Sequence, residues 1–184
     1  MLIPLNRVLR PLLPAFFAFA SISASASAQI DESFSCDASN GGVQEFEVPV
    51  SPRAHLITGR VLFESRDFTG SDIPSAHIAF GDSASSPDPG HCQCKGIRAQ
   101  IFPDEPDTVK FYVVSNGHAV GIAQGPVGTP ITFAFSIDPN GLMTASIGRT
   151  NRVSKSSKLS NPHRDRVHVT CSSAEVQFLN LHME

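Results

Sequence analysis

The sequence predicts an all-β fold, an antiparallel β-sandwich of the jelly-roll kind, and two observations predict it. Nearly every apolar run is short, alternates with polar residues and is rich in Val, Ile, Phe and Thr, as in strands with one buried face. The runs are separated by turn residues, and no window of about ten residues keeps a helical period without Gly or Pro. About ten short strands at regular spacing are typical of a sandwich or jelly roll.

Ten strands are expected between residue 43 and residue 181. They are Val43–Val50, Leu56–Glu64, Ala76–Phe80, Ile97–Phe102, Val109–Val114, Ala119–Ala123, Ile131–Ile137, Leu142–Ile147, Arg166–Cys171 and Glu175–Leu181. Between them, Asn116-Gly117 and Asp138-Pro139-Asn140-Gly141 predict tight turns. The segments Ser65–Ser75, Gly81–Gly96 and Arg149–Pro162 lack strand character and are expected to be loops, where binding sites are common.

Residues 1–28 are interpreted as a signal peptide. Two arginines among the first ten residues precede a short apolar segment, and Ala26-Ser27-Ala28 is a small-x-small cleavage site. The apolar segment is shorter than the roughly 20 residues of a membrane span and contains proline. We therefore expect an exported protein, periplasmic or extracellular, in which residues 29–184 form one domain without a transmembrane segment.

The four cysteines predict two disulfides, because an even number in an exported chain is usually oxidised. If the terminal strands are neighbours, Cys36–Cys171 is the favoured bond, and it leaves Cys92–Cys94. Pairings that tie Cys92 and Cys94 separately to the other two cysteines stay open. His91, Cys92 and Cys94 could also hold a soft metal, but the C-x-C spacing is not that of common zinc sites. We predict no metal site there.

Part of the chain resembles a known group of folds. Residues 109–181 contain ITFAFSIDPNGLMTASIG, a polar loop and the closing strand RVHVTCSSAEVQFLNL, and Thr58–Ser65 reads TGRVLFES. This pattern of strands and turns resembles laminin-G-type and concanavalin A-like lectin/glucanase sandwiches. The resemblance implies two curved antiparallel sheets in a fold whose members mostly bind glycans or proteins, while some cleave polysaccharides. It carries over no functional residue.

The segment from residue 149 to residue 166 holds a concentration of positive charge. Six of the 14 Lys and Arg residues lie there, opposed only by Asp165: Arg149, Arg152, Lys155, Lys158, Arg164 and Arg166. Arginine binds sulfate, phosphate or uronate groups by paired hydrogen bonds. These six are the predicted ligand-binding residues, and the expected partner is an acidic glycan or an extracellular protein. A net charge of −3 and few aromatic residues argue against nucleic acid.

No catalytic residue is predicted. Glu45 and Glu47 are the only acidic pair that shares one face of an expected strand, and their alternation with Phe46 and Val48 places them toward solvent. The E-x-D-x-x-E strand of the glucanases is absent. No cofactor is predicted either. Many proteins of the resembled fold bind Ca²⁺ at loop tips, and Asp67, Asp72, Asp82 and Asp88 could supply oxygens, but they form no compact acidic loop.

The function that these observations favour is a non-catalytic exported module that binds a surface glycan or a protein. One alternative is a polysaccharide-acting enzyme, a hydrolase or lyase, which would need His, Tyr and Arg or paired carboxylates on one sheet face. The other alternative is a structural component of the envelope or of an appendage.

Overall fold

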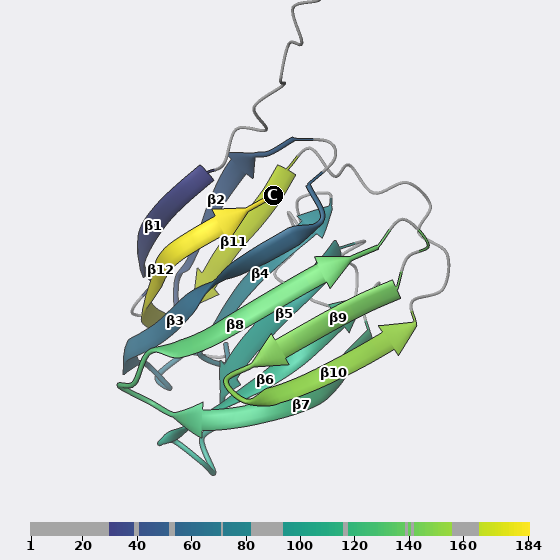
Figure 1. Ribbon diagram of the computed structural model, residues 1–184. Helices are drawn as coiled ribbons and strands as arrows, with labels where there is room; N and C mark the ends of the chain where they lie inside the picture. The colour runs from purple at the N-terminus through teal and green to yellow at the C-terminus, as the bar shows by residue number, and fades with distance from the viewer. Residues whose placement is uncertain are drawn as a thin grey trace, which may run out of the picture.

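The described chain forms two six-stranded antiparallel sheets packed face to face (Figure 1). The computed structural model describes residues 30–38, 41–51, 54–70, 72–81, 94–115, 118–138, 140, 142–155 and 166–184. Sheet A contains, in spatial order, β1 (Ile30–Asp37), β12 (Ala174–Met183), β3 (Leu56–Arg66), β8 (Ile131–Ile137), β9 (Leu142–Ile147) and β10 (Thr150–Lys155). Sheet B contains β2 (Val43–Pro49), β11 (Arg166–Ser172), β4 (Ser75–Gly81), β5 (Cys94–Ile101), β6 (Thr108–Ser115) and β7 (His118–Pro126). The antiparallel jelly-roll sandwich predicted from the sequence is confirmed.

The core lies between the sheets and is rich in phenylalanine. Along each central strand, alternate side chains point inward and are fully buried, as the period of two predicts. The rings of Phe80 in sheet B and Phe135 in sheet A lie 6.5 Å apart across the sandwich. Most inward positions hold apolar side chains, and the fully buried Lys95 on β5 is an exception. The two outer faces therefore hold most of the polar side chains of the sheets.

A disulfide joins the two sheets. Cys36 on β1 and Cys171 on β11 are bonded, with a Cα–Cα distance of 6.2 Å, and both side chains are fully buried. The favoured pairing is therefore confirmed. The pairing was favoured on the expectation that the terminal strands are neighbours in one sheet. In the structure β1 and β11 belong to different sheets, and the bond crosses the core between them. Cys94 is also disulfide-bonded, and its partner lies outside the described residues.

Ten of the observed strands match the predicted ones within a few residues, and two were not predicted. β1 directly follows the expected cleavage site, and β10 lies inside the segment Arg149–Pro162, which was wrongly expected to be a loop throughout. β10 forms because Gly148, with a φ of +56°, and Arg149 turn the chain back so that Thr150 pairs with Ile147. β5 likewise begins at Cys94, within a segment expected to be irregular.

The predicted signal peptide, residues 1–28, lies outside the described residues, so export stays a prediction. Over the part of the chain that the structure does describe, no helix is long and apolar enough to cross a membrane.

Candidate functional site

The outer face of sheet B differs from the β8–β9 part of sheet A, whereas β3 of sheet A also carries the outward charged residues Arg60 and Glu64. On β8 and β9 of sheet A the outward residues are small and uncharged, for example Ala134, Ser136, Thr144 and Ser146. On sheet B the positions that alternate with the core residues hold charged, imidazole, phenol and amide side chains. These outward residues include Glu45, Glu47, His77, Arg98, Gln100, Lys110, Tyr112, Gln124, Arg166, His168 and Thr170. This varied polar face of sheet B is the candidate site.

The strand register brings five of these residues into one row across the sheet. Consecutive Cα partners run Glu45, Thr170, His77, Arg98 and Tyr112, from edge strand β2 through β11, β4 and β5 to β6. Directly opposite side chains on neighbouring strands lie close enough to interact. The row thus presents a carboxylate, a hydroxyl, an imidazole, a guanidinium and a phenol to one side of the sheet.

His77 is a neutral imidazole at the centre of the row. Burial lowers its pKa from 6.5 to about 4, and the charge of Arg98 and the nearby ring of His168 add to this effect. Its Nε2 atom lies 3.9 Å from the Sγ atom of Cys94. At neutral pH, His77 can therefore exchange hydrogen bonds with a ligand without adding positive charge to the face.

The lowered pKa of His77 makes stability depend on pH. The unfolded chain takes up a proton near pH 6.5, whereas the folded ring stays neutral until about pH 4. Folded stability is therefore complete above pH 6.5 and falls on acidification toward pH 4, by up to about 3 kcal/mol from this group. We expect His77→Gln to lose less stability than the wild type between pH 7 and pH 4.5 in denaturant titrations. Equal losses in the two proteins would contradict this assignment.

Arg98 is a partly buried guanidinium without a carboxylate partner among the described residues. Its Nε atom is buried and has no hydrogen-bond partner. Burial lowers the pKa of Arg98, while the nearby Tyr112 phenol acts in the opposite direction. A buried donor without a partner costs free energy unless water or a ligand satisfies it. Arg98 is therefore positioned to bind an incoming anionic group.

His168 presents a second buried polar atom to the same face. Its Nδ1 atom lies 3.0 Å from Oε1 of Glu45, which orients the ring, and its Nε2 atom is buried without a partner. With Nδ1 donating to Glu45, Nε2 of the ring is a hydrogen-bond acceptor, and a hydroxyl group could donate to it.

The other described cations of this face already have anionic partners. Arg166 on β11 forms an ion pair with Glu47 on β2. Lys110 forms an ion pair of 2.7 Å with Glu105, and this hydrogen bond raises the pKa of Lys110. These pairs leave Arg98 as the described cation of the face whose charge no carboxylate balances.

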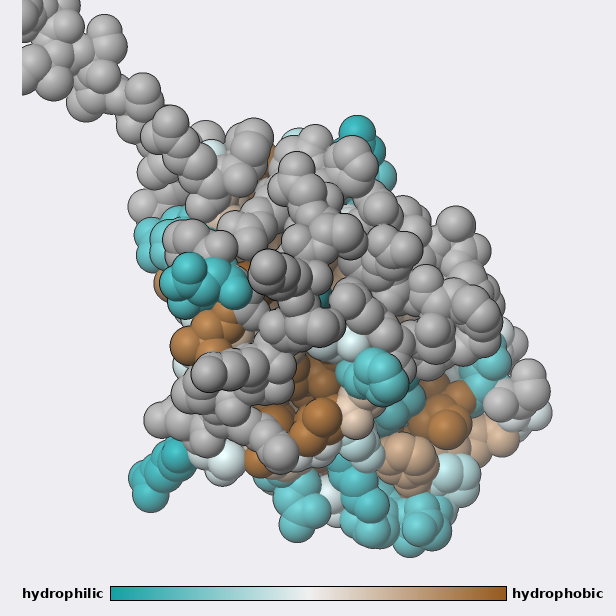
Figure 2. All heavy atoms as spheres, turned by 90° about the vertical axis from the view of Figure 1, so that its right-hand side faces the viewer, coloured by the Kyte–Doolittle hydropathy of each residue, from teal (hydrophilic) through white to brown (hydrophobic). Residues whose placement is uncertain are grey.

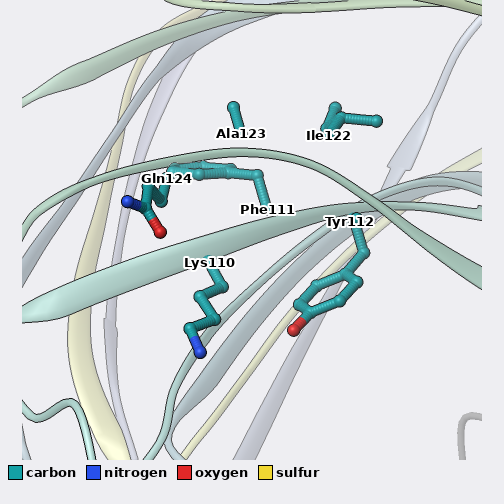
Figure 3. Close-up of a pocket in the computed structure, with 7 residues that line it drawn as sticks. Lys110, Phe111, Tyr112, Ile122, Ala123 and Gln124 are labelled. Carbon is teal, nitrogen blue, oxygen red and sulfur yellow. The ribbon is translucent and has the colours of Figure 1, made fainter.

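A shallow cavity of about 300 Å³ lies over β6 and β7, next to the row. Its lining residues are Lys110, Phe111, Tyr112, Gly121, Ile122, Ala123 and Gln124. Figure 3 shows Lys110 and Tyr112 projecting to one side of β6 and Phe111 to the other. A β-bulge between Phe111 and Tyr112 interrupts the pairing of the two strands at this point.

On the side of the molecule shown in Figure 2, hydrophobic and hydrophilic residues alternate over short distances.

The six predicted ligand-binding residues are not gathered on one sheet. Arg149 is exposed in the turn between β9 and β10 of sheet A, and Arg152 and Lys155 lie along β10. Arg166 begins β11 on the outer face of sheet B. Lys158 and Arg164 lie outside the described residues. A contact of this basic segment with a ligand stays a prediction.

The sequence analysis did not select the residues of this row as a site, although the sequence contains a signal for three of them. His77, Arg98 and Tyr112 alternate with apolar residues on three expected strands, which places each on a solvent-facing side. Their strands are consecutive partners in one sheet, and consecutive strands usually pair. Combining the two rules would have placed the three side chains together.

The loop aspartates do not assemble a cation site among the described residues. Oδ1 of Asp67 accepts hydrogen bonds from the backbone N–H and the hydroxyl of Thr69, a local turn. Asp72 is exposed, and Asp82 and Asp88 lie outside the described residues. Across the described ranges, no group of three or more His, Cys, Asp and Glu side chains is placed to hold a metal ion.

Comparison with solved structures identifies the fold. The carbohydrate recognition domain of Emp46p, in a potassium-bound form, matches with a TM-score of 0.50 and 11% identity over 84% of this chain and 86% of that chain. A structure described as a native glycosidic hydrolase matches with a TM-score of 0.50 and 9% identity over 83% of this chain and 76% of that chain. The carbohydrate-binding module CBM66 from Bacillus subtilis matches with a TM-score of 0.47 and 14% identity over 84% of this chain and 94% of that chain.

These likenesses establish the fold and nothing finer, because the identities are so low. The chain has the concanavalin A-like jelly-roll sandwich fold, as its sequence resemblance implied. No protein-family model matches the sequence, and no curated protein is significantly similar to it.

Proposed function

We propose that the protein is an exported, non-catalytic module that binds an acidic glycan through the outer face of sheet B. In this proposal Arg98 holds a carboxylate or sulfate group of the glycan. The observation that carries the proposal is the partly buried guanidinium of Arg98, which lacks a carboxylate partner among the described residues and has a buried Nε atom without a hydrogen bond.

The charge balance of the face supports an anionic ligand at Arg98. Arg166 and Lys110 are paired with Glu47 and Glu105, so added anions would compete with existing partners there. At Arg98 no such competition exists among the described residues. A carboxylate or sulfate can accept two parallel hydrogen bonds from one guanidinium, which restores the interactions lost on burial.

The neighbours of Arg98 support a sugar as the carrier of that anion. Sugar hydroxyls both donate and accept hydrogen bonds, and the row offers the Thr170 hydroxyl, the neutral His77 ring and the Tyr112 phenol. The Emp46p domain, which has a similar fold, is a carbohydrate recognition domain. The alternative ligand is an extracellular protein with a surface carboxylate, and the test must distinguish it from a glycan.

The test measures the affinity for acidic and neutral oligosaccharides by isothermal titration calorimetry. Arg98→Gln is expected to weaken binding of the acidic ligand about 10- to 100-fold, as loss of a charged hydrogen-bonding partner does, and to reduce its salt dependence. The matched control is Arg60→Gln, which removes an exposed arginine on β3 of sheet A and should change nothing. Equal affinity of wild type and Arg98→Gln, or equal binding of neutral sugars, would overturn the proposal.

A polysaccharide-acting enzyme is the second candidate, and one observation favours it. His77, Arg98 and Tyr112 are consecutive members of one row, the kind of convergence that such an enzyme needs. The acid pair Glu45 and Glu47 is already engaged by His168 and Arg166. Incubating the protein with an acidic polysaccharide and measuring the polymer length by size-exclusion chromatography separates the two candidates, because a binding module leaves the length unchanged.

A further inference from the structure

We infer that the cavity over β6 and β7 is a second sugar subsite, so that the ligand is an oligosaccharide lying across the strands and not a single terminal sugar. This inference rests on the proposed function at Arg98. It adds the direction and the minimum extent of the ligand, which the charge of Arg98 alone does not define.

Tyr112 connects the two subsites. On one side its Cα partner is Arg98 of β5, and on the other side it is Gly121 of β7. Gly121 has no side chain to cover the tyrosine, and a Cβ atom built there would lie 3.7 Å from Cε1 of the ring. The aromatic ring can therefore face a ligand in the cavity, and such rings pack against the apolar face of a sugar.

The far end of the cavity supplies polar groups for the hydroxyls of that sugar. Lys110 and Gln124 are Cα partners one step along the same face, and both line the cavity. Lys110 is oriented by its ion pair with Glu105, so its ammonium can donate further hydrogen bonds without leaving that partner. The Gln124 amide can both donate and accept.

The bulge opposite Tyr112 explains why a hollow exists at this place. The register shift between Phe111 and Tyr112 inserts Ile122 as an extra residue on β7 and interrupts the ladder. Bulges re-aim side chains and are frequent beside functional sites. The fully buried Phe111 closes the core side, so the hollow beside Lys110 and Tyr112 is backed by packed protein.

The spacing of the strands fits a chain of sugars. Neighbouring strands lie about 4.8 Å apart, and Arg98 lies on β5, two strands from β7, so the distance between β5 and β7 is about 10 Å. That distance exceeds the width of one sugar ring. A ligand anchored at Arg98 and extended toward β7 fills the cavity, whereas a single sugar at Arg98 does not span the distance to β7.

The test measures affinity for one acidic oligosaccharide as a function of its length. In the wild type, affinity should rise about tenfold between the shortest acidic ligand and a chain long enough to reach β7. Gly121→Leu, which places a side chain between the Tyr112 ring and the cavity, should remove this gain, while the shortest ligand still binds through Arg98. Gln124→Ala should reduce the gain severalfold. The control is Ala119→Leu, which adds the same bulk on the same face of β7 outside the cavity lining.

The outcomes distinguish the subsite from the proposed function. Binding of the shortest acidic ligand without any gain from length, or an equal gain in wild type, Gly121→Leu and Gln124→Ala, overturns the subsite alone. Absence of binding at every length overturns the acidic-glycan function and the subsite with it. A gain lost in both cavity variants and kept in Ala119→Leu supports the subsite.

Discussion

Replacing Cys36 and Cys171 together by alanine is expected to lower the free energy of unfolding by roughly 2–5 kcal/mol. The bond joins residues 135 positions apart, and it ties β1 of sheet A to β11 of sheet B. Its loss frees a long loop in the unfolded chain and leaves a small void between the sheets. The double replacement avoids leaving one reactive thiol in the core.

Denaturant unfolding of the variant and the wild type checks this prediction. Ser172→Ala, a change at the neighbouring position on β11, is the control and should alter stability by no more than about 0.5 kcal/mol. An unchanged unfolding midpoint in the double variant would show that the bond adds nothing to the sandwich.

Gly96→Ala is expected to destabilise the protein by about 3 kcal/mol or more, or to prevent folding. A Cβ atom at Gly96 would lie 2.0 Å from the carbonyl oxygen of Ile78 and 2.5 Å from Cα of Ala79. Both contacts are with the backbone of β4, which cannot rotate away as a side chain could. Strands β4 and β5 would have to separate next to the paired positions of His77 and Arg98.

The matched control for Gly96→Ala is Gly121→Ala on β7. There the nearest atom, Cε1 of Tyr112, lies at an ordinary contact distance of 3.7 Å, so the change should cost within about 0.5 kcal/mol. Thermal unfolding and soluble yield compare the two variants. Similar melting temperatures for both would mean that β4 and β5 are not as close at Gly96 as the structure has them.

The strands could be predicted from sequence where one face of a strand is buried. Ile131–Ile137 and Leu142–Ile147, for example, alternate apolar and polar residues and were predicted with their observed bounds. β10 gave no such signal, because it is a polar edge strand held by its backbone pairing with β9. Its existence depends on a neighbour and not on its own composition.

The candidate site could not be predicted in the same way, because it depends on register between strands. The sequence draws attention to the basic segment from residue 149 to residue 166, where charges are close along the chain. In the fold, Arg152 lies in sheet A and Arg166 in sheet B. His77, Arg98 and Tyr112 are far apart in sequence and adjacent in sheet B. β11, which brings Thr170 and His168 to them, comes from near the end of the chain.

The central claim is that Arg98 contacts an acidic glycan on the outer face of sheet B. The most direct measurement follows the Nε–Hε resonance of Arg98 by NMR while an acidic oligosaccharide is added. Our account predicts a large shift of this resonance and slower exchange of its proton with water, because its buried Nε atom gains a hydrogen-bond acceptor. It also predicts backbone shifts along β4, β5 and β6. An unchanged Arg98 resonance, with shifts confined to the segment from residue 149 to residue 166, would contradict the claim.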